Sequence, residues 1–121
     1  KGANNMETFV KNKSFEIRFT LLYEDTGLPI NLTDLDDIDV VIRHKSTKEE
    51  LLTRTMSDSN NEVVIITAAS GICAIYINGA DTASADSGKY EAIITVTIDN
   101  SYFDDSTGDF AVLTDAFILI D

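Results

Sequence analysis

Apolar and polar residues alternate along two long stretches of the chain. In residues 15–23 the odd positions are Phe, Ile, Phe, Leu and Tyr, whereas Glu16, Arg18 and Thr20 stand between them. In residues 90–98 the even positions are Tyr, Ala, Ile, Val and Ile, and most odd positions are polar. Successive side chains of a strand point to opposite faces, so both stretches are predicted to be half-buried β-strands.

Shorter runs rich in β-branched residues predict the remaining strands. They cover residues 38–44, 51–56, 63–67, 72–77 and 112–120. Turn residues separate them at a spacing of roughly 8–12 residues, which is typical of a β-sandwich. We expect residues 46–50 to form a charged connection rather than a helical turn, residues 80–85 to cross between strands, and no helix. The prediction is an all-β, immunoglobulin-like antiparallel sandwich of about seven strands.

Two turns carry residues to which we assign structural roles. Asp-Ser-Gly-Lys-Tyr at residues 86–90 resembles the tyrosine corner of immunoglobulin-type sandwiches, so Gly88 and Tyr90 are expected to shape the entry to a central strand. Antibody domains place a disulfide cysteine two residues after this tyrosine, where this chain has Ala92. In the earlier turn, Gly27 is expected to supply a positive φ and Pro29 an extended entry to the next segment.

The length of 121 residues suits one domain, which we place at residues 14–121. Residues 1–13 are either a tether from a preceding domain or an edge strand around residues 8–11, and the sequence leaves both open. Cys73 is the single cysteine, so no internal disulfide can form, and we expect its thiol to be buried.

The net charge of −12 excludes some partners. Nucleic-acid binding depends on clustered Lys and Arg, and anionic membranes repel an acidic surface, so we expect neither partner. No run approaches the roughly 18 apolar residues of a membrane span. The acidity favours solubility, a cation site or a basic partner.

Acidic clusters are the only candidates for a metal site. A first set, Asp34, Asp36, Asp37 and Asp39, offers oxygen ligands of the kind Ca²⁺ prefers, and a second set is Asp104, Asp105 and Asp109. The spacing does not fit an EF-hand loop, so we favour solvated carboxylates at a strand entrance and expect no metal or other cofactor. His44 is the single histidine, and with one cysteine the chain offers no nucleophile–base set, so we expect no catalytic residue and no enzyme activity.

Tyr102 and Phe103 are the aromatic residues best placed to contact a ligand. They lie in a stretch at residues 100–109 that we expect to be a long loop. Aromatic rings can stack on sugars, but plugging the end of the sandwich is the favoured role for this pair.

Several motifs occur in an order that resembles a known family. They are Phe-Glu-Ile-Arg-Phe-Thr-Leu at 15–21, Asp-Thr-Gly-Leu-Pro-Ile-Asn-Leu-Thr at 25–33, Val-Val-Ile-Arg at 40–43, Gly71, Ile-Tyr-Ile at 75–77, Asp-Thr-Ala at 81–83 and Gly-Lys-Tyr at 88–90. This pattern resembles the immunoglobulin-like β-sandwich domains of tailed-phage and prophage baseplate, tail and tail-fibre proteins, and is similar to the N-terminal domain of baseplate upper proteins. It covers most of residues 14–98.

The resemblance implies a structural module without enzyme activity. Such a module docks other virion proteins, often as a homo-oligomer in the full assembly, and would be found in the virion after assembly in the bacterial cytoplasm. The alternative is an adhesion or glycan-binding module of the same architecture on a bacterial cell surface.

Overall fold

The computed structural model describes residues 6–23, 25–33, 35–56, 63–99 and 107–121. These residues form eight strands, one short α-helix and one 3₁₀ turn. In chain order they are β1 (Thr8–Val10), β2 (Phe15–Thr20), β3 (Leu35–His44), β4 (Glu50–Thr55), β5 (Val64–Thr67), η1 (Ala68–Ser70), β6 (Ile72–Ile77), α1 (Gly79–Thr82), β7 (Gly88–Asp99) and β8 (Thr107–Ile120).

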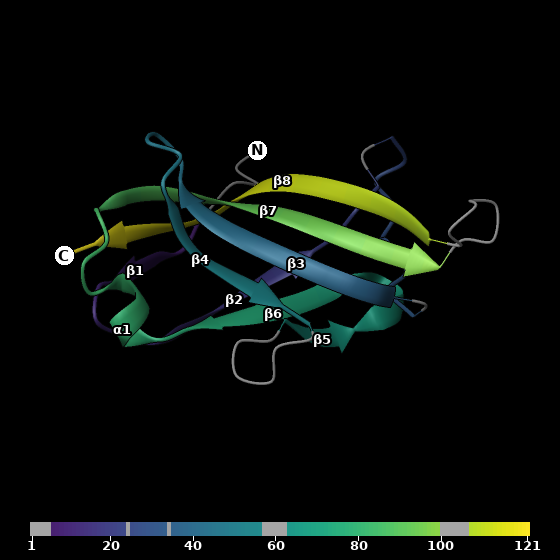
Figure 1. Cartoon of the computed structure of the whole chain (residues 1–121), viewed down its shortest axis with the longest axis horizontal. Coiled ribbons are helices and arrows are strands. Elements are labelled where there is room, and N and C mark those ends of the chain that lie inside the picture. Colours follow the sequence, from purple (N-terminus) through teal and green to yellow (C-terminus); the bar gives the residue numbers. More distant parts are fainter. Residues whose placement is uncertain (1–5, 24, 34, 57–62, 100–106) are drawn as a thin grey trace.

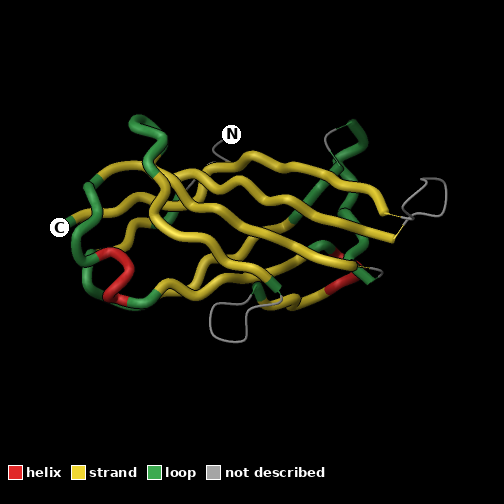
Figure 2. Tube along the Cα trace, viewed as in Figure 1, coloured by secondary structure: helices red, strands yellow, loops and turns green. Residues whose placement is uncertain are grey.

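The strands form two facing sheets (Figure 1). One has five strands in the order β1-β8-β7-β3-β4, and the other has three in the order β2-β6-β5. All neighbours are antiparallel except β1, which pairs in parallel with β8. Figure 2 shows how little of the described chain is helical. The predicted all-β, immunoglobulin-like sandwich is therefore confirmed, and Cys73 is a free thiol.

The core lies between the sheets and is built from the alternation that the sequence shows. The even positions of β7 from Tyr90 to Val96 are at most 2% exposed, and they belong to the same core cluster as Ile17 and Phe19, the buried odd positions of β2. β3 adds Ile38, Val40 and Ile42, all fully buried. Each of these three strands thus turns one apolar face inward, and the burial of these faces is the main favourable contribution to the stability of such a fold.

Three elements differ from the sequence-based expectation. β8 begins at Thr107, inside the expected loop, because it pairs with β7 as far as Asp99, beyond the apolar run. β3 begins at Leu35, which pairs with Ile98 before an irregularity in the ladder. Long-range pairing extends both strands into polar sequence.

The expectation of no helix was wrong at α1. Asn78 and Asp81 form a reciprocal capping box around this short helix. Gly79 lies so close to the β1–β2 turn that a Cβ there would be 2.5 Å from the carbonyl oxygen of Asn12. Thr82 is fully buried and accepts a hydrogen bond from the Asn12 amide. The helix is therefore stabilised by a contact with residues far away in sequence.

A buried arginine links the two sheets near this helix. Arg54 of β4 is 6% exposed, and its guanidinium donates to the carboxylate of Asp81 at 2.8 Å and to the carbonyl of Tyr76 at 3.5 Å. The pairing satisfies a charge that would otherwise be costly to bury.

The tyrosine corner is present. The hydroxyl of Tyr90 donates to the carbonyl oxygen of Asp86 at 2.7 Å. Gly88 has a φ of 132°, and a Cβ at this position would lie 2.8 Å from the Nε2 atom of His44. The His44 ring also packs edge-on against the Tyr90 ring. The chain enters β7 through a bend in which a side chain at residue 88 would be strained.

The Tyr90→Phe variant tests this corner. Loss of the buried hydrogen bond should lower the free energy of unfolding by about 1 kcal/mol or more. Denaturant unfolding measures the change, and Tyr76→Phe is the control, since its hydroxyl bonds Glu16 on the exposed surface. Equal stability of wild type and Tyr90→Phe would mean that the corner contributes nothing.

Candidate functional site

One side of the sandwich, between β2 and β8, is only partly covered. β2 is one of the two edge strands of the three-stranded sheet. β1 pairs with residues 118–120 of β8, and in the described part of the chain the rest of β8 pairs with β7 alone. Two strand edges therefore face outward on the same side of the molecule.

β1 closes one end of this side. Phe9 of β1 stacks on Phe15 of β2 with ring centroids 4.0 Å apart, and it meets Phe117 of β8 edge-on at 6.2 Å. The amide of Ile118 donates to the carbonyl of Glu7, and the amide of Lys11 donates to the carbonyl of Ile120. β1 thus adds a strand to β8 and places an aromatic ring between the sheets.

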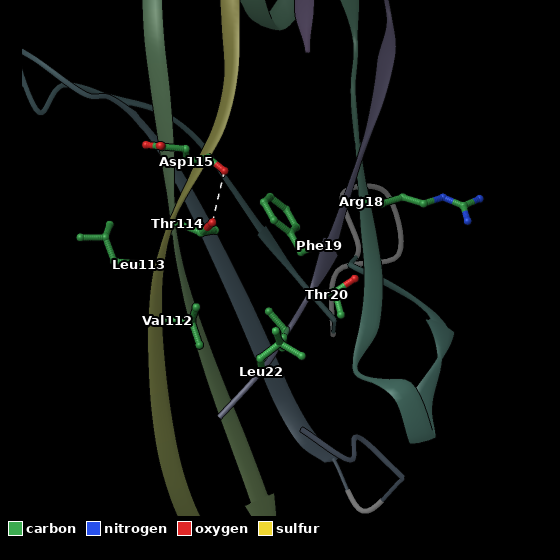
Figure 3. Close-up of a pocket in the computed structure, with 9 residues that line it drawn as sticks. Arg18, Phe19, Thr20, Leu22, Val112, Leu113, Thr114 and Asp115 are labelled. Atoms are coloured by element: carbon green, nitrogen blue, oxygen red, sulfur yellow. Dashed lines mark hydrogen bonds between the residues drawn. The ribbon is translucent and has the colours of Figure 1, made fainter. Parts of the chain in front are cut away.

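Beyond β1 the same side forms a groove, which we call the open-side groove (Figure 3). It is lined by Arg18, Phe19, Thr20, Leu21 and Leu22 from β2 and the turn after it, and by Val112, Leu113, Thr114 and Asp115 from β8. Its volume is about 280 Å³. This lies just below the range of roughly 300–1,000 Å³ that is usual for small-molecule pockets.

The lining side chains divide into two sets. In Figure 3, Phe19, Val112 and Thr114 point into the space between β2 and β8, whereas Arg18 and Leu113 point away from it. Val112 and Thr114 are only half-buried, although their positions on β8 face the interior. Leu113 is 62% exposed on the outer face. The groove therefore offers the partly exposed Val112 and Thr114 inside and the exposed Leu113 outside.

The backbone of β8 also faces outward here. The amide of Lys45 donates to the carbonyl of Lys89, so the odd residues of β7 bond to β3 and its even residues bond to β8. The residues of β8 between those bonded to β7 therefore direct their backbone groups outward. These are Ala111, Leu113 and Asp115, whose N–H and C=O groups point away from β7. The Thr114 hydroxyl donates to the Asp115 carbonyl at 3.3 Å.

The opposite rim, on β2, is arranged in the same way. The amide of Leu21 donates to the carbonyl of Gly71, so the odd residues of β2 bond to β6. The backbone groups of Arg18 and Thr20 therefore face outward. The two edges provide rows of hydrogen-bonding groups on either side of the apolar lining.

Ion pairs hold the charged side chains of the rim. Arg18 lies 3.0 Å from Glu16, and the Tyr76 hydroxyl donates to the same carboxylate at 2.8 Å. Both hydrogen bonds lower the pKa of Glu16, and the bond from Tyr76 has the larger effect. Lys45 lies 2.6 Å from Asp115, which raises the pKa of Lys45. These charges are paired within the protein and do not project into the groove.

A second charged group lies on the outer face of the five-stranded sheet. The Glu91 carboxylate is almost fully covered and accepts from Arg43 at 2.6 Å and from Lys48 at 3.0 Å. Both hydrogen bonds lower the pKa of Glu91, and the bond from Lys48 has the larger effect. Its partners hold this carboxylate in the charged form, which indicates a structural role.

The first acidic cluster lies at the start of β3. Asp34 is outside the described residues, Asp36 is exposed, and Asp37 accepts a hydrogen bond from the amide of Ile38. Burial, and then the charge of Asp37, raises the pKa of Asp39. Within the described ranges, no group of three or more histidine, cysteine or acidic residues is arranged to hold a metal ion.

Of the candidate residues in the expected loop at residues 100–109, the structure describes Asp109 alone. Tyr102, Phe103, Asp104 and Asp105 lie outside the described residues, whereas Asp109 belongs to β8. In the other turn, Gly27 has the expected positive φ of 71°, and Pro29 pairs with Leu22 in an isolated bridge.

His44 and Cys73 have structural surroundings. The amides of Ser46 and Thr47 donate to Nδ1 of His44, so Nε2 carries the proton and donates to the carbonyl of Ser87 at 3.1 Å. Cys73 is fully buried, and burial raises its thiol pKa to about 11. Neither residue borders the open-side groove.

The sequence interpretation missed this groove. Val112, Leu113 and Thr114 belong to a run that reads as one more strand, and Phe19 reads as an ordinary core residue. A signal is present in the adjacent apolar pair Val112 and Leu113, which must face opposite sides of a strand. One of the two must therefore leave the core.

Comparison with known proteins assigns no family. No protein-family model matches the chain, and no curated protein matches it. In the described part of the structure, no helix is long and apolar enough to cross a membrane.

We predict that Cys73 is unreactive in the folded protein. Its burial and raised pKa keep the thiol protonated at neutral pH, and thiolate is the reactive form. A thiol-reactive chromogenic reagent should label the protein only after denaturant is added. Fast labelling of the native protein would contradict the buried position.

We predict that Glu91 stabilises the fold except in acid. Its folded-state pKa is lower than the ordinary 4.5, so its contribution is complete above that pH and is lost as the pH falls through the lower folded-state pKa. Glu91→Gln should therefore be less stable than wild type near pH 7, with the difference shrinking in acid. Denaturant unfolding over a pH series measures this, and a constant difference would contradict it.

Proposed function

We propose that this protein is a non-enzymatic assembly module of a phage or prophage virion, which docks other virion proteins in a baseplate, tail or tail fibre. The open-side groove is the observation that carries the proposal. Its outward-facing backbone groups, half-buried Val112 and exposed Leu113 suit contact with another polypeptide. The motif resemblance supports the virion setting.

The shape of the site favours a protein partner over a small molecule. The groove is small and open, and its lining combines apolar side chains with two threonines, of which Thr114 donates its hydroxyl to the carbonyl of Asp115. The rim charges of Arg18 and Asp115 are already paired. Little remains to orient a small substrate, whereas a strand edge offers a row of regularly spaced hydrogen-bonding groups.

The net charge of −12 supports partners that carry basic residues rather than nucleic acid or anionic membranes. In the full assembly we expect several copies of the chain, held in the virion after assembly in the bacterial cytoplasm. The alternative, adhesion or glycan binding at a bacterial surface, is an outcome of the test.

A photo-crosslinking amino acid at Leu113 tests the proposal. Benzoylphenylalanine in place of Leu113 should capture a baseplate, tail or tail-fibre protein from phage lysate, as identified by mass spectrometry. The control carries the same group at Tyr76, which is 47% exposed on the other sheet. We expect little capture there.

Failure to capture any virion protein from position 113, together with a positive glycan array, would overturn the virion proposal. It would favour the adhesion module instead.

A further inference from the structure

The open-side groove continues the path of β1. β1 lies between β2 and β8, pairs in parallel with residues 118–120 and sends Phe9 between the sheets. The groove lies between the same two strands, past the N-terminal end of β1. A strand placed there would continue an interface that β1 already makes with β8.

The backbone requirements of such a strand are met. Ala111, Leu113 and Asp115 direct their N–H and C=O groups away from β7, as Ile118 and Ile120 do where β1 binds them. An extended segment could therefore pair with β8 without displacing any strand in the described part of the fold.

The side-chain requirements follow from strand alternation. Every second residue of an added strand would point between the sheets, as Phe9 does, and would meet Phe19 and Val112. These positions call for apolar residues. The intervening residues would point outward, on the side where Leu113 is exposed.

Net charge distinguishes between the proteins that could supply this strand. Two copies of this chain each carry a net charge of −12, and the repulsion between them opposes self-association. A segment with Lys or Arg at its outward positions would be attracted instead. The favoured occupant therefore belongs to a different, basic protein.

We propose that the open-side groove binds an extended segment of a second protein, with apolar residues at alternate positions and basic residues between them. The segment adds to the five-stranded sheet as a strand beside residues 111–115 of β8. The inference rests on the proposed docking function for its biological setting, whereas its test uses the isolated protein.

The test uses a short synthetic peptide in which lysines alternate with valine and phenylalanine. At a peptide concentration about ten times the dissociation constant, hydrogen exchange at the amides of Ala111, Leu113 and Asp115 should slow by about tenfold. A peptide of the same composition, with its lysines in one block, is the control for simple charge attraction. It should leave these amides unprotected.

Two variants at one position separate backbone pairing from side-chain contact. Leu113→Pro removes an outward N–H group and should abolish binding of the alternating peptide, because proline cannot donate to a ladder. Leu113→Ala keeps that group and loses only part of a side chain on the outer face of β8, so its binding should weaken far less than that of Leu113→Pro.

If Leu113→Pro does not fold, a second pair of variants gives the answer. Val112→Asn places a polar group on the inner wall and should weaken peptide binding by about fivefold or more. Val10→Asn, at an exposed position on β1, should not weaken it.

The inference is overturned by equal protection with both peptides, by protection that misses the edge of β8, or by binding that survives both Leu113→Pro and Val112→Asn. Dimerisation of the protein through this edge, detected by light scattering, would also overturn it in favour of a second copy. Crosslinking to virion proteins without strand protection would leave the docking function standing and reject strand addition. Protection of these amides without crosslinks to virion proteins would support strand addition and reject the docking function in a virion.

Discussion

The structure depends on burial of one face of β7 between the two sheets. β7 is flanked by β3 and β8 over most of its length, and its even residues from Tyr90 to Val96 are nearly inaccessible to solvent. With Cys73 as the only cysteine, no cross-link restrains the unfolded chain, and stability has to come from packing and hydrogen bonds. Ala92 stands where a bridge would be, fully buried among apolar neighbours. The corner at Gly88 and Tyr90 determines how the chain enters this strand.

The open-side groove follows from the different extents of the strands around that core. β8 runs for fourteen residues, and β1 covers its last three. β2 has no strand beyond it in the described part of its sheet. A strand edge exposes regularly spaced donors and acceptors, and soluble proteins commonly blunt such an edge with charge or cover it. Here paired charges occupy the rims, at Arg18 with Glu16 and Lys45 with Asp115, while Val112 and Thr114 between them remain partly exposed.

The charged residues on the outer face of the five-stranded sheet stabilise the fold rather than border the groove. Arg43 and Lys48 converge on Glu91 from β3 and the turn after it, so the three groups connect neighbouring segments. The residues considered as candidates for chemistry likewise make local hydrogen bonds. His44 accepts hydrogen bonds from backbone amides of its own turn, and Asp37 accepts one from the amide of Ile38. These contacts organise the scaffold, and the accessible binding features are concentrated on the side between β2 and β8.

The sequence by itself determined the all-β class, most strands, the positive φ of Gly27 and the Tyr90 corner. Each of these depends on local alternation or on the conformational preference of one or two residues. The tertiary structure decided what lies beside what. The helix at Gly79 needs its contact with Asn12, the start of β8 at Thr107 needs its pairing with Asp99, and β1 is an edge strand because it pairs with residues 118–120. The groove is of the same kind, since period-two alternation states which face of a strand is apolar but not which strand, if any, covers its edge. That depends on contacts between residues far apart in the chain.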